Sequence, residues 1–365
     1  MNKKILFLST LPPPFYGASV VSEKCLEILK KTFGIQVENI KLNYSKEMSD
    51  VGKIKASKVS GFFKVRKQIK KSLKELCPDL VYFAPATANL GLLRDFLFIR
   101  QIKKSKIPII FHIHSRVFHN NSAYNFLYKR MFQNEKAVVL GKELVSDIDK
   151  YVNKKNIFIL PNAIDNIVNN NEFLKIRQER KKKKVVDLLF LSNMDKTKGW
   201  VKVLEACKIL KNKNLNFRCS FVGDWVDKID EIKFNKYKTQ MQKQIFYLGK
   251  KTGNEKNKIY KNSDILIFPT YYKLETFGMV IIEAMMFGLP VVASNVASIP
   301  SIVSQKKTGF LLKENSPDEI ANYVEQLIKN QSLREKMSTQ GRKKFLDEFE
   351  SRNYEKKLRK IIFGT

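Results

Sequence analysis

The sequence is poor in the residues that build disulfides and metal sites. Its 365 residues include four cysteines and three histidines. The cysteines, Cys25, Cys77, Cys207 and Cys219, show neither metal-ligand nor redox spacing. We therefore expect reduced thiols, as in a cytoplasmic protein.

Long hydrophobic runs are also absent. No stretch approaches the roughly 18 continuous apolar residues of a membrane span. The apolar run at Ile5–Leu8 is too short for a signal peptide and is soon followed by Pro12–Pro14, so it predicts a buried strand and a turn. A chain of this length with 44% hydrophobic residues suits two domains.

Acidic residues are scarce relative to basic ones. The 68 Lys and Arg against 35 Asp and Glu give a net charge of +33, which favours binding to nucleic acid or anionic lipid. In Lys53–Lys74, basic residues alternate with apolar ones, as in segments that lie on a membrane. We expect Phe62 and Phe63 to insert there and the basic residues to bind an anionic membrane surface. A solvated helix face is the alternative.

Short strand-like runs alternate with helical ones along the chain, which is typical of parallel sheets with helices on both faces. The expected strands are residues 5–9, 80–84, 109–114, 137–140, 157–160, 185–192, 217–222, 245–248, 265–268 and 291–294. The alternation predicts two doubly wound α/β domains, residues 1–168 and 169–345, followed by a terminal helical segment, 346–365. The charged run Arg177–Lys184 is interpreted as a solvated linker or helix face.

The most informative segment is Glu275–Ala284. Two carboxylates, Glu275 and Glu283, stand eight positions apart around an apolar helical run that we expect to begin near Phe277. A helix N-terminus there would offer N–H groups to a phosphate or diphosphate. The two carboxylates would reach hydroxyl groups on either side of it, as a nucleotide sugar requires. An unpaired Glu283 within an apolar stretch would be costly, which argues for a functional role.

These residues resemble the E-x7-E signature of family-4 (group 1) retaining glycosyltransferases. The resemblance extends to further segments, although Ala163 and Trp225 stand where the family has glycines. These further segments are Pro161–Asp165, Leu191–Met194 with Lys198-Gly199, Phe221–Asp224, the Thr308–Leu311 turn and Gly288–Val292.

The resemblance implies a GT-B architecture: two Rossmann-like domains facing a cleft, with a C-terminal helix that returns to the N-terminal domain. It implies transfer of a hexose-type sugar from a UDP- or GDP-sugar to a glycan acceptor, with retention, without a metal and without a cofactor. We expect a lipid-linked acceptor in bacterial surface polysaccharide assembly (capsule, O-antigen or exopolysaccharide). The protein would lie peripherally at the inner face of the cell membrane.

The resemblance also implies site residues. Glu275 and His114 are the expected catalytic residues, contacting the transferred sugar. The expected donor-binding residues are Gly17, Asn193, Lys198, Thr276, Phe277, Gly278 and Glu283. Lys198 would contact the diphosphate and Glu283 the ribose hydroxyls. Asn193 replaces the family's arginine and removes one cation, for which Lys196 is a candidate replacement.

Two alternatives stay open at this point, one of them another enzyme and the other a binding protein. One is a GT-B-shaped sugar-nucleotide epimerase. The other is a basic nucleic-acid or polyanion-binding protein, although no zinc site, helix-turn-helix or aromatic-interleaved single-strand motif supports it.

Overall fold

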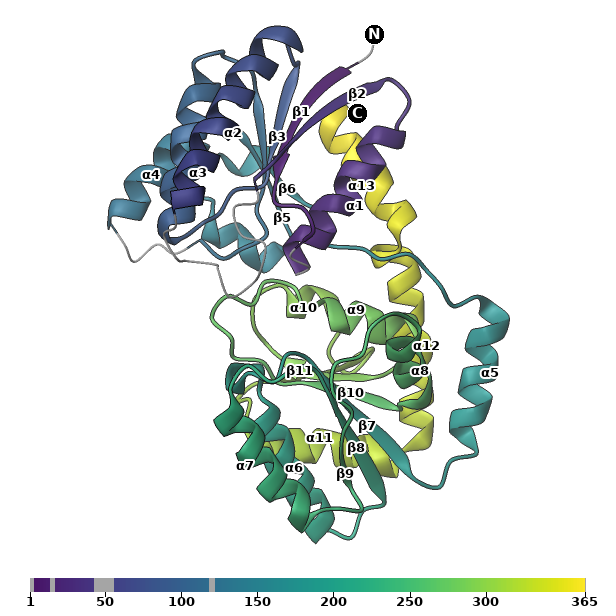
Figure 1. The fold of residues 1–365 in the computed structure, drawn as a ribbon. Helices are drawn as coiled ribbons and strands as arrows, with labels where there is room; N and C mark the ends of the chain where they lie inside the picture. The colour runs from purple at the N-terminus through teal and green to yellow at the C-terminus, as the bar shows by residue number, and fades with distance from the viewer. Residues whose placement is uncertain (1–2, 14–16, 43–55, 118–121, 365) are drawn as a thin grey trace. The chain divides into compact units, whose positions relative to one another are not determined.

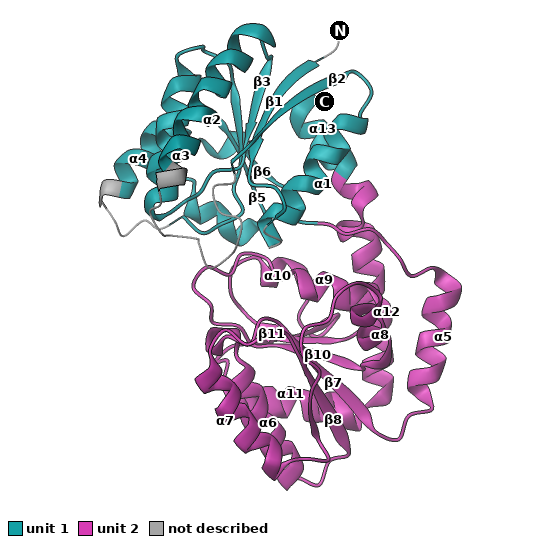
Figure 2. Ribbon diagram, viewed as in Figure 1, with its two compact units in different colours: residues 1–162, 355–365 teal, residues 163–354 magenta. Residues whose placement is uncertain are grey.

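The computed structural model describes residues 3–13, 17–42, 56–117 and 122–364, which form two α/β units (Figure 2). Unit 1 consists of Met1–Asn162 and Glu355–Thr365, and unit 2 of Ala163–Tyr354. The division falls at residue 162, six residues before the predicted boundary at 168. The tail also divides later than the predicted 346, because residues 346–354 belong to unit 2.

Unit 1 is built on a six-stranded parallel sheet of order β2-β1-β3-β4-β5-β6. Helices α2, α3 and α4 cover one face, and α1 and α13 the other (Figure 1). The elements are β1 (Lys3–Ser9), α1 (Gly17–Lys31), β2 (Ile35–Lys41), α2 (Ala56–Glu75), β3 (Leu80–Phe83), α3 (Asn89–Lys103), β4 (Ile109–His112), α4 (Ser122–Phe132), β5 (Lys136–Val139), the 3-10 turns η2 (Lys142–Asp147) and η3 (Lys154–Asn156), and β6 (Ile157–Ile159).

Unit 2 has a second six-stranded parallel sheet, of order β12-β11-β10-β7-β8-β9. Its elements begin with α5 (Asn170–Lys181), β7 (Val186–Leu191), the 3-10 turn η4 (Lys196–Lys198), α6 (Trp200–Asn212), β8 (Phe217–Val222), α7 (Lys228–Gln240), β9 (Ile245–Tyr247) and α8 (Gly253–Asn262). They continue with β10 (Ile265–Phe268), α9 (Met279–Met286), β11 (Val291–Ser294), α10 (Ile299–Ile302), β12 (Gly309–Leu312), α11 (Pro317–Lys329), α12 (Gln331–Lys344) and the π-helical turn η5 (Phe345–Phe349).

The last helix, α13 (Ser351–Phe363), enters unit 1, as predicted for the C-terminal helix. Leu358, Ile361 and Ile362 are buried. The Lys3 ammonium donates to the carbonyl of Ile362 at 2.6 Å. The predicted doubly wound α/β fold is thus confirmed, and the ten expected strands are all present with small shifts at their ends.

Two strands escaped sequence analysis. The edge strand β2 alternates too weakly between apolar and polar residues to stand out. Residues 308–311 were interpreted as a turn, yet Gly309–Leu312 form β12 beside β11. A Cβ on Gly309 would lie 2.0 Å from the carbonyl oxygen of Val291, so only glycine permits this approach.

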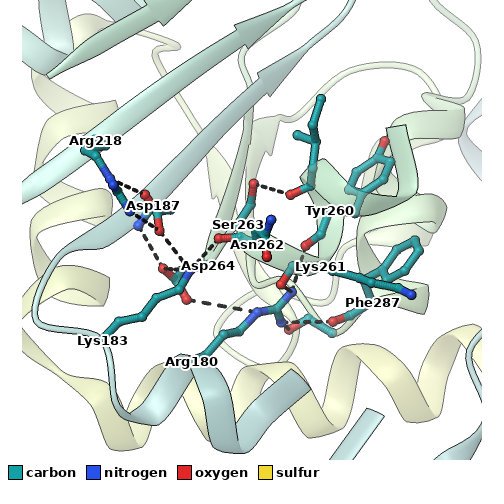
Figure 3. A network of polar contacts seen from close by, with 12 residues as sticks. Arg180, Lys183, Asp187, Arg218, Tyr260, Lys261, Asn262, Ser263, Asp264 and Phe287 are labelled. Atoms are coloured by element: carbon teal, nitrogen blue, oxygen red, sulfur yellow. Dashed lines mark hydrogen bonds and ion pairs between the residues drawn. The ribbon is translucent and has the colours of Figure 1, made fainter. Parts of the chain in front are cut away.

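The charged run at Arg177–Lys184 is not a solvated linker. It ends α5, and its side chains tie that helix to the amino ends of the strands in unit 2 (Figure 3). Arg180 donates to the carbonyls of Phe287 and Tyr260 at 2.9 and 2.8 Å. Lys183 pairs with Asp187 and Asp264. Burial lowers the pKa of Arg180 to about 10, and Asp264 opposes that shift.

The basic amphipathic segment forms α2, but its apolar face is used by the fold. Val65 and Ile69 are buried, and Phe62 stacks on Phe98 of α3 with 5.1 Å between ring centroids. Insertion of Phe62 into a membrane is therefore not compatible with this packing, whereas Phe63 is 59% exposed. Lys53 and Lys55 lie outside the described residues.

This assignment of faces predicts opposite stability effects on one helix. Ile69→Ala should lower the free energy of unfolding by about 2–5 kcal/mol, because it opens a cavity in the core. Phe63→Ala should change it by no more than about 0.5 kcal/mol. Urea unfolding of both variants checks this, and equal losses would contradict the orientation of α2.

Candidate functional site

The site lies where the strand order of unit 2 reverses. From β7 the chain continues outward through β8 and β9, and then returns to the other side of β7 with β10, β11 and β12. In open parallel sheets, ligands bind beyond the carboxyl ends of the strands at such a switch point. The loops after β7 and β10 carry Lys198 and Glu275, so the topology brings these two predicted residues together.

Lys198 and Glu275 form a half-buried ion pair. The Lys198 Nζ lies 2.8 Å from Glu275 Oε2, with the side chains 18% and 11% exposed. The ammonium also sits 4.2 Å from the ring centroid of Tyr272. Such an ammonium, held by its neighbours, can meet an anion with little further ordering.

The backbone fixes Lys198 at the start of α6. Asp195 caps the turn η4 by accepting from the N–H of Thr197, and Gly199 follows in the left-handed conformation with φ 91°. A Cβ on Gly199 would lie 2.3 Å from the carbonyl oxygen of Pro269. The N–H groups of the first turn of a helix are available to an anion, so Lys198 and the α6 N-terminus can act together.

The other signature carboxylate has two partners that sequence analysis did not identify. Glu283 Oε1 accepts from Lys256 Nζ at 2.7 Å, and Oε2 accepts from the Tyr260 hydroxyl at 2.7 Å. Burial is the main cause that raises the pKa of Tyr260 well above its usual value, and the negative charge of Glu283 adds to it. The phenol therefore stays a hydrogen-bond donor. Lys256 and Tyr260 share one face of α8, a spacing the sequence shows, but nothing in it pairs them with Glu283.

The signature helix begins later than predicted. Helix α9 starts at Met279, not near Phe277, and its N-cap Gly278 has φ 84°. Phe277 is buried and packs edge-on against Phe349 with 6.2 Å between centroids, so its side chain anchors the loop. The carbonyl of Thr276 accepts from the N–H of Ser298 at 3.0 Å. Any contact between Phe277 and a nucleotide-sugar donor would therefore involve the backbone of Phe277.

Asn193 is exposed in the loop after β7, as its predicted role requires. The candidate replacement cation, Lys196, is 3.1 Å from the buried Asp230. The hydrogen bond that the Lys196 ammonium donates to this carboxylate raises the pKa of Lys196. Lys196 is thus directed to Asp230 of α7, whereas Lys198 is paired with the signature carboxylate Glu275 and is therefore the better placed cation of the loop.

The other predicted residues, Gly17 and His114, belong to unit 1. Gly17 is the first residue of α1, in the loop after β1, and a Cβ there would meet nothing within 4 Å. No steric demand of the described structure therefore requires glycine at this position. His114 lies two residues beyond the end of β4.

The two histidines at the carboxyl end of β4, His112 and His114, differ in their contacts. His112 Nδ1 lies 2.7 Å from the Tyr82 hydroxyl, as expected of a satisfied core histidine. Among the described residues, neither ring nitrogen of His114 has a hydrogen-bond partner. Burial lowers the pKa of His114 to about 4, so its imidazole is neutral at pH 7 and offers one donor and one acceptor. His119 lies outside the described residues.

The sequence of unit 2 matches a known family. Residues 171–344, nearly all of unit 2, match the family model described as glycosyl transferases group 1. Unit 2 therefore belongs to the group 1 glycosyltransferases. The predicted family resemblance is thereby confirmed.

Relatives of the chain include one protein from a cps region and one glycosyltransferase of capsular polysaccharide biosynthesis. An uncharacterized 41.2 kDa protein in the cps region of Klebsiella pneumoniae is 24% identical over 279 residues, covering 74% of each chain. The capsular polysaccharide biosynthesis glycosyltransferase CapM of Staphylococcus aureus is 29% identical over 164 residues, covering 44% of this chain and 42% of CapM. The match therefore spans less than half the length of CapM.

The solved structure of Anabaena Alr3699/HepE in complex with UDP aligns over 100% of both chains with a TM-score of 0.75 and 14% identity. At that identity the likeness shows the fold alone, and the fold is of the GT-B type. None of the helices in the described part of the chain combines the length and hydrophobicity needed to cross a bilayer.

The environment of His114 predicts a pH effect on stability. Its pKa is about 4 in the folded protein and about 6.5 in the unfolded chain, so the unfolded chain binds more protons between these values. Stability should fall as the pH drops from about 6.5 to about 4. His114→Asn should remove about 3 kcal/mol of this decline, as measured by urea unfolding across that range. An unchanged pH profile would contradict the neutral, buried state of His114.

Proposed function

We propose that this chain is a metal-independent, retaining glycosyltransferase that moves a hexose-type sugar from UDP- or GDP-sugar to a hydroxyl of a lipid-linked glycan. The observation that carries the proposal is the Lys198–Glu275 pair at the switch point of unit 2, with Glu283 eight residues further on. This set offers one cation for the diphosphate of the donor, one carboxylate for its transferred sugar and one carboxylate for its ribose.

The diphosphate is the leaving group. As the bond from the anomeric carbon to the phosphate oxygen breaks, negative charge grows on the diphosphate and positive charge on the sugar. Lys198 and the N-terminus of α6 would stabilise the former. Glu275 would accept hydrogen bonds from sugar hydroxyls and stabilise the developing positive charge. His114 would contact the same sugar from unit 1 as a neutral donor or acceptor.

The nucleoside would be held by Glu283. Each oxygen of this carboxylate already accepts one hydrogen bond, from Lys256 or Tyr260, and keeps capacity for a ribose hydroxyl. Lys256 and Tyr260 would then act as positioning residues that fix the carboxylate plane. The UDP in the Anabaena neighbour makes UDP the first nucleotide to test.

The acceptor side of the proposal rests on the capsule-locus relatives. The polymers made there would be bacterial surface polysaccharides, and their assembly on a lipid carrier would place the enzyme at the inner face of the cell membrane. We further propose that unit 1 binds the acceptor.

Lys198→Ala should reduce turnover of the donor by roughly 10²–10³-fold, the scale of losing one preorganised contact to a leaving group. The matched control Lys196→Ala removes a lysine of the same loop that is already paired with Asp230, and should have little effect. Release of nucleoside diphosphate from the donor, coupled to acceptor, measures both. Equal losses in the two variants would contradict the assignment.

EDTA tests the metal-free part of this proposal. Among the described residues, no three His, Cys, Asp or Glu side chains gather where they could hold a metal ion. Metal independence itself remains a prediction. We expect activity to survive EDTA, and a strict requirement for Mn²⁺ would contradict this.

The two glutamates should differ in their kinetics. Glu283→Gln should weaken binding of free UDP or GDP, because the carboxylate that accepts from ribose is lost. Glu275→Gln should lower turnover without weakening nucleotide binding, since its loss leaves Lys198 available to the diphosphate. Calorimetry with the nucleotide and initial rates with the donor separate these effects, and the reverse pattern would refute the assignment.

A further inference from the structure

Helix α3 exposes an apolar stripe that the fold of unit 1 does not use. Leu90, Leu93 and Leu97 are 54%, 49% and 39% exposed, and their spacing of three and four residues places them on one face. The opposite face is filled by Leu92, Phe98, Ile99 and Ile102, all buried. A helix on a domain surface needs only one apolar face, so the leucine stripe calls for a second partner.

The neighbouring helices extend this stripe. Helix α3 packs between α2 and α4 on one side of the sheet (Figure 1). Helix α2 adds the exposed Val59 and Phe63, and α4 adds the exposed Phe126. We call these six residues, Val59, Phe63, Leu90, Leu93, Leu97 and Phe126, the three-helix face. Exposed apolar side chains gathered on adjacent helices in this way mark an interaction site.

The charged residues of these three helices are predominantly basic. Helix α2 carries exposed Lys64, Arg66, Lys67, Lys70, Lys71 and Lys74, and its only acidic residue is Glu75 at its end. Helix α4 adds Lys129 and Arg130, with the Arg130 guanidinium 5.0 Å from the ring centroid of Phe126, and has no acidic residue. In α3 the only acidic residue, Asp95, is buried and bonded to Arg94.

We propose that the three-helix face docks on an anionic lipid bilayer. Its six apolar side chains enter the interfacial layer, and the basic residues of α2 and α4 bind lipid phosphates and carboxylates. A second copy of this chain fits poorly, because its own face carries the same positive charge. A nucleic acid fits poorly because protruding leucines offer it no hydrogen bonds.

The position of the face suits the proposed function, on which this step rests. Leu90 and Leu93 lie at the start of α3, which follows the carboxyl end of β3. That is the edge of the unit 1 sheet from which the Gly17 and His114 loops emerge. Lipid docked there would therefore bring a lipid-linked acceptor to the edge of unit 1 that carries the predicted catalytic histidine.

Flotation with vesicles of phosphatidylglycerol and phosphatidylcholine tests the docking. The full chain should bind vesicles that contain phosphatidylglycerol, bind pure phosphatidylcholine far less, and be partly released by 1 M salt, where the Debye length is about 3 Å. Leu93→Ser with Leu97→Ser should weaken vesicle binding at least about tenfold, because two half-buried apolar contacts with lipid are lost. The matched control, Ile229→Ser with Ile232→Ser, removes two exposed isoleucines of α7 in unit 2 and should bind like the wild type.

A second variant tests how much the basic residues of α2 contribute to vesicle binding. Replacing Lys64, Arg66, Lys67, Lys70 and Lys71 with Gln should abolish vesicle binding at physiological salt. If this variant and the leucine pair both bind vesicles like the wild type, the docking proposal is wrong. It is also wrong if the leucine pair changes only the oligomeric state in size-exclusion chromatography, because the face would then be a contact between copies.

Activity separates this proposal from the proposed function. The leucine pair should keep donor-dependent transfer to a soluble acceptor analogue and lose it only with an acceptor embedded in vesicles. Vesicle binding without any transfer in the wild type would refute the enzymatic proposal and support the docking. Transfer that is equal with soluble and embedded acceptors in the leucine pair would refute the docking and leave the enzymatic proposal standing.

Discussion

The candidate site depends on one close backbone contact, between the loops that follow β7 and β10. The absence of a side chain at Gly199 lets the start of α6 lie against the carbonyl of Pro269, where a Cβ would be only 2.3 Å from the oxygen. The N–H of Tyr271 then donates to the carbonyl of Thr197 at 2.7 Å. These contacts hold the two loops together at the switch point. Lys198 and Glu275, which flank them, therefore meet although 77 positions separate them.

A second constraint is the burial of both signature carboxylates. Glu275 and Glu283 each have a side chain less than 20% exposed, and each is paired with a lysine from another element. A partly buried carboxylate without a partner would be costly, so the lysines are needed before any ligand arrives. The side chains of the site are therefore ordered before a ligand binds, and a ligand would have to compete with these ion pairs. In the proposed reaction, an incoming diphosphate would share Lys198 with Glu275, and this would link donor binding to the release of the carboxylate that meets the sugar.

Much of this could be predicted from the sequence, and the failures have physical reasons. Strands such as Phe217–Val222 and Ile265–Phe268 are short, continuous apolar runs, which a doubly buried parallel strand requires. Glu275 and Glu283 stand out because carboxylates are rare in apolar surroundings. Lys256 and Tyr260 do not stand out, since their role arises only when α8 packs beside α9. The apolar residues of α2 were assigned to a membrane because one amphipathic helix looks the same whether its partner is a sheet or a lipid.

The leucines of α3 distinguish a face that packs on the sheet from a face that is left for lipid, which the pattern of α2 alone does not do. In α2 most apolar residues lie toward α3 and the sheet, so the fold explains most of its pattern, although Val59 and Phe63 stay exposed. In α3 the buried side chains already satisfy the sheet, and Leu90, Leu93 and Leu97 remain on the outer face. An apolar residue on the outside costs solubility and contributes nothing to the core, so a helix that is apolar on both faces indicates two partners. The large positive charge of the chain is then informative because it surrounds this stripe on α2 and α4, whereas many cations of unit 2, including Lys183, Lys198 and Lys256, are paired with carboxylates.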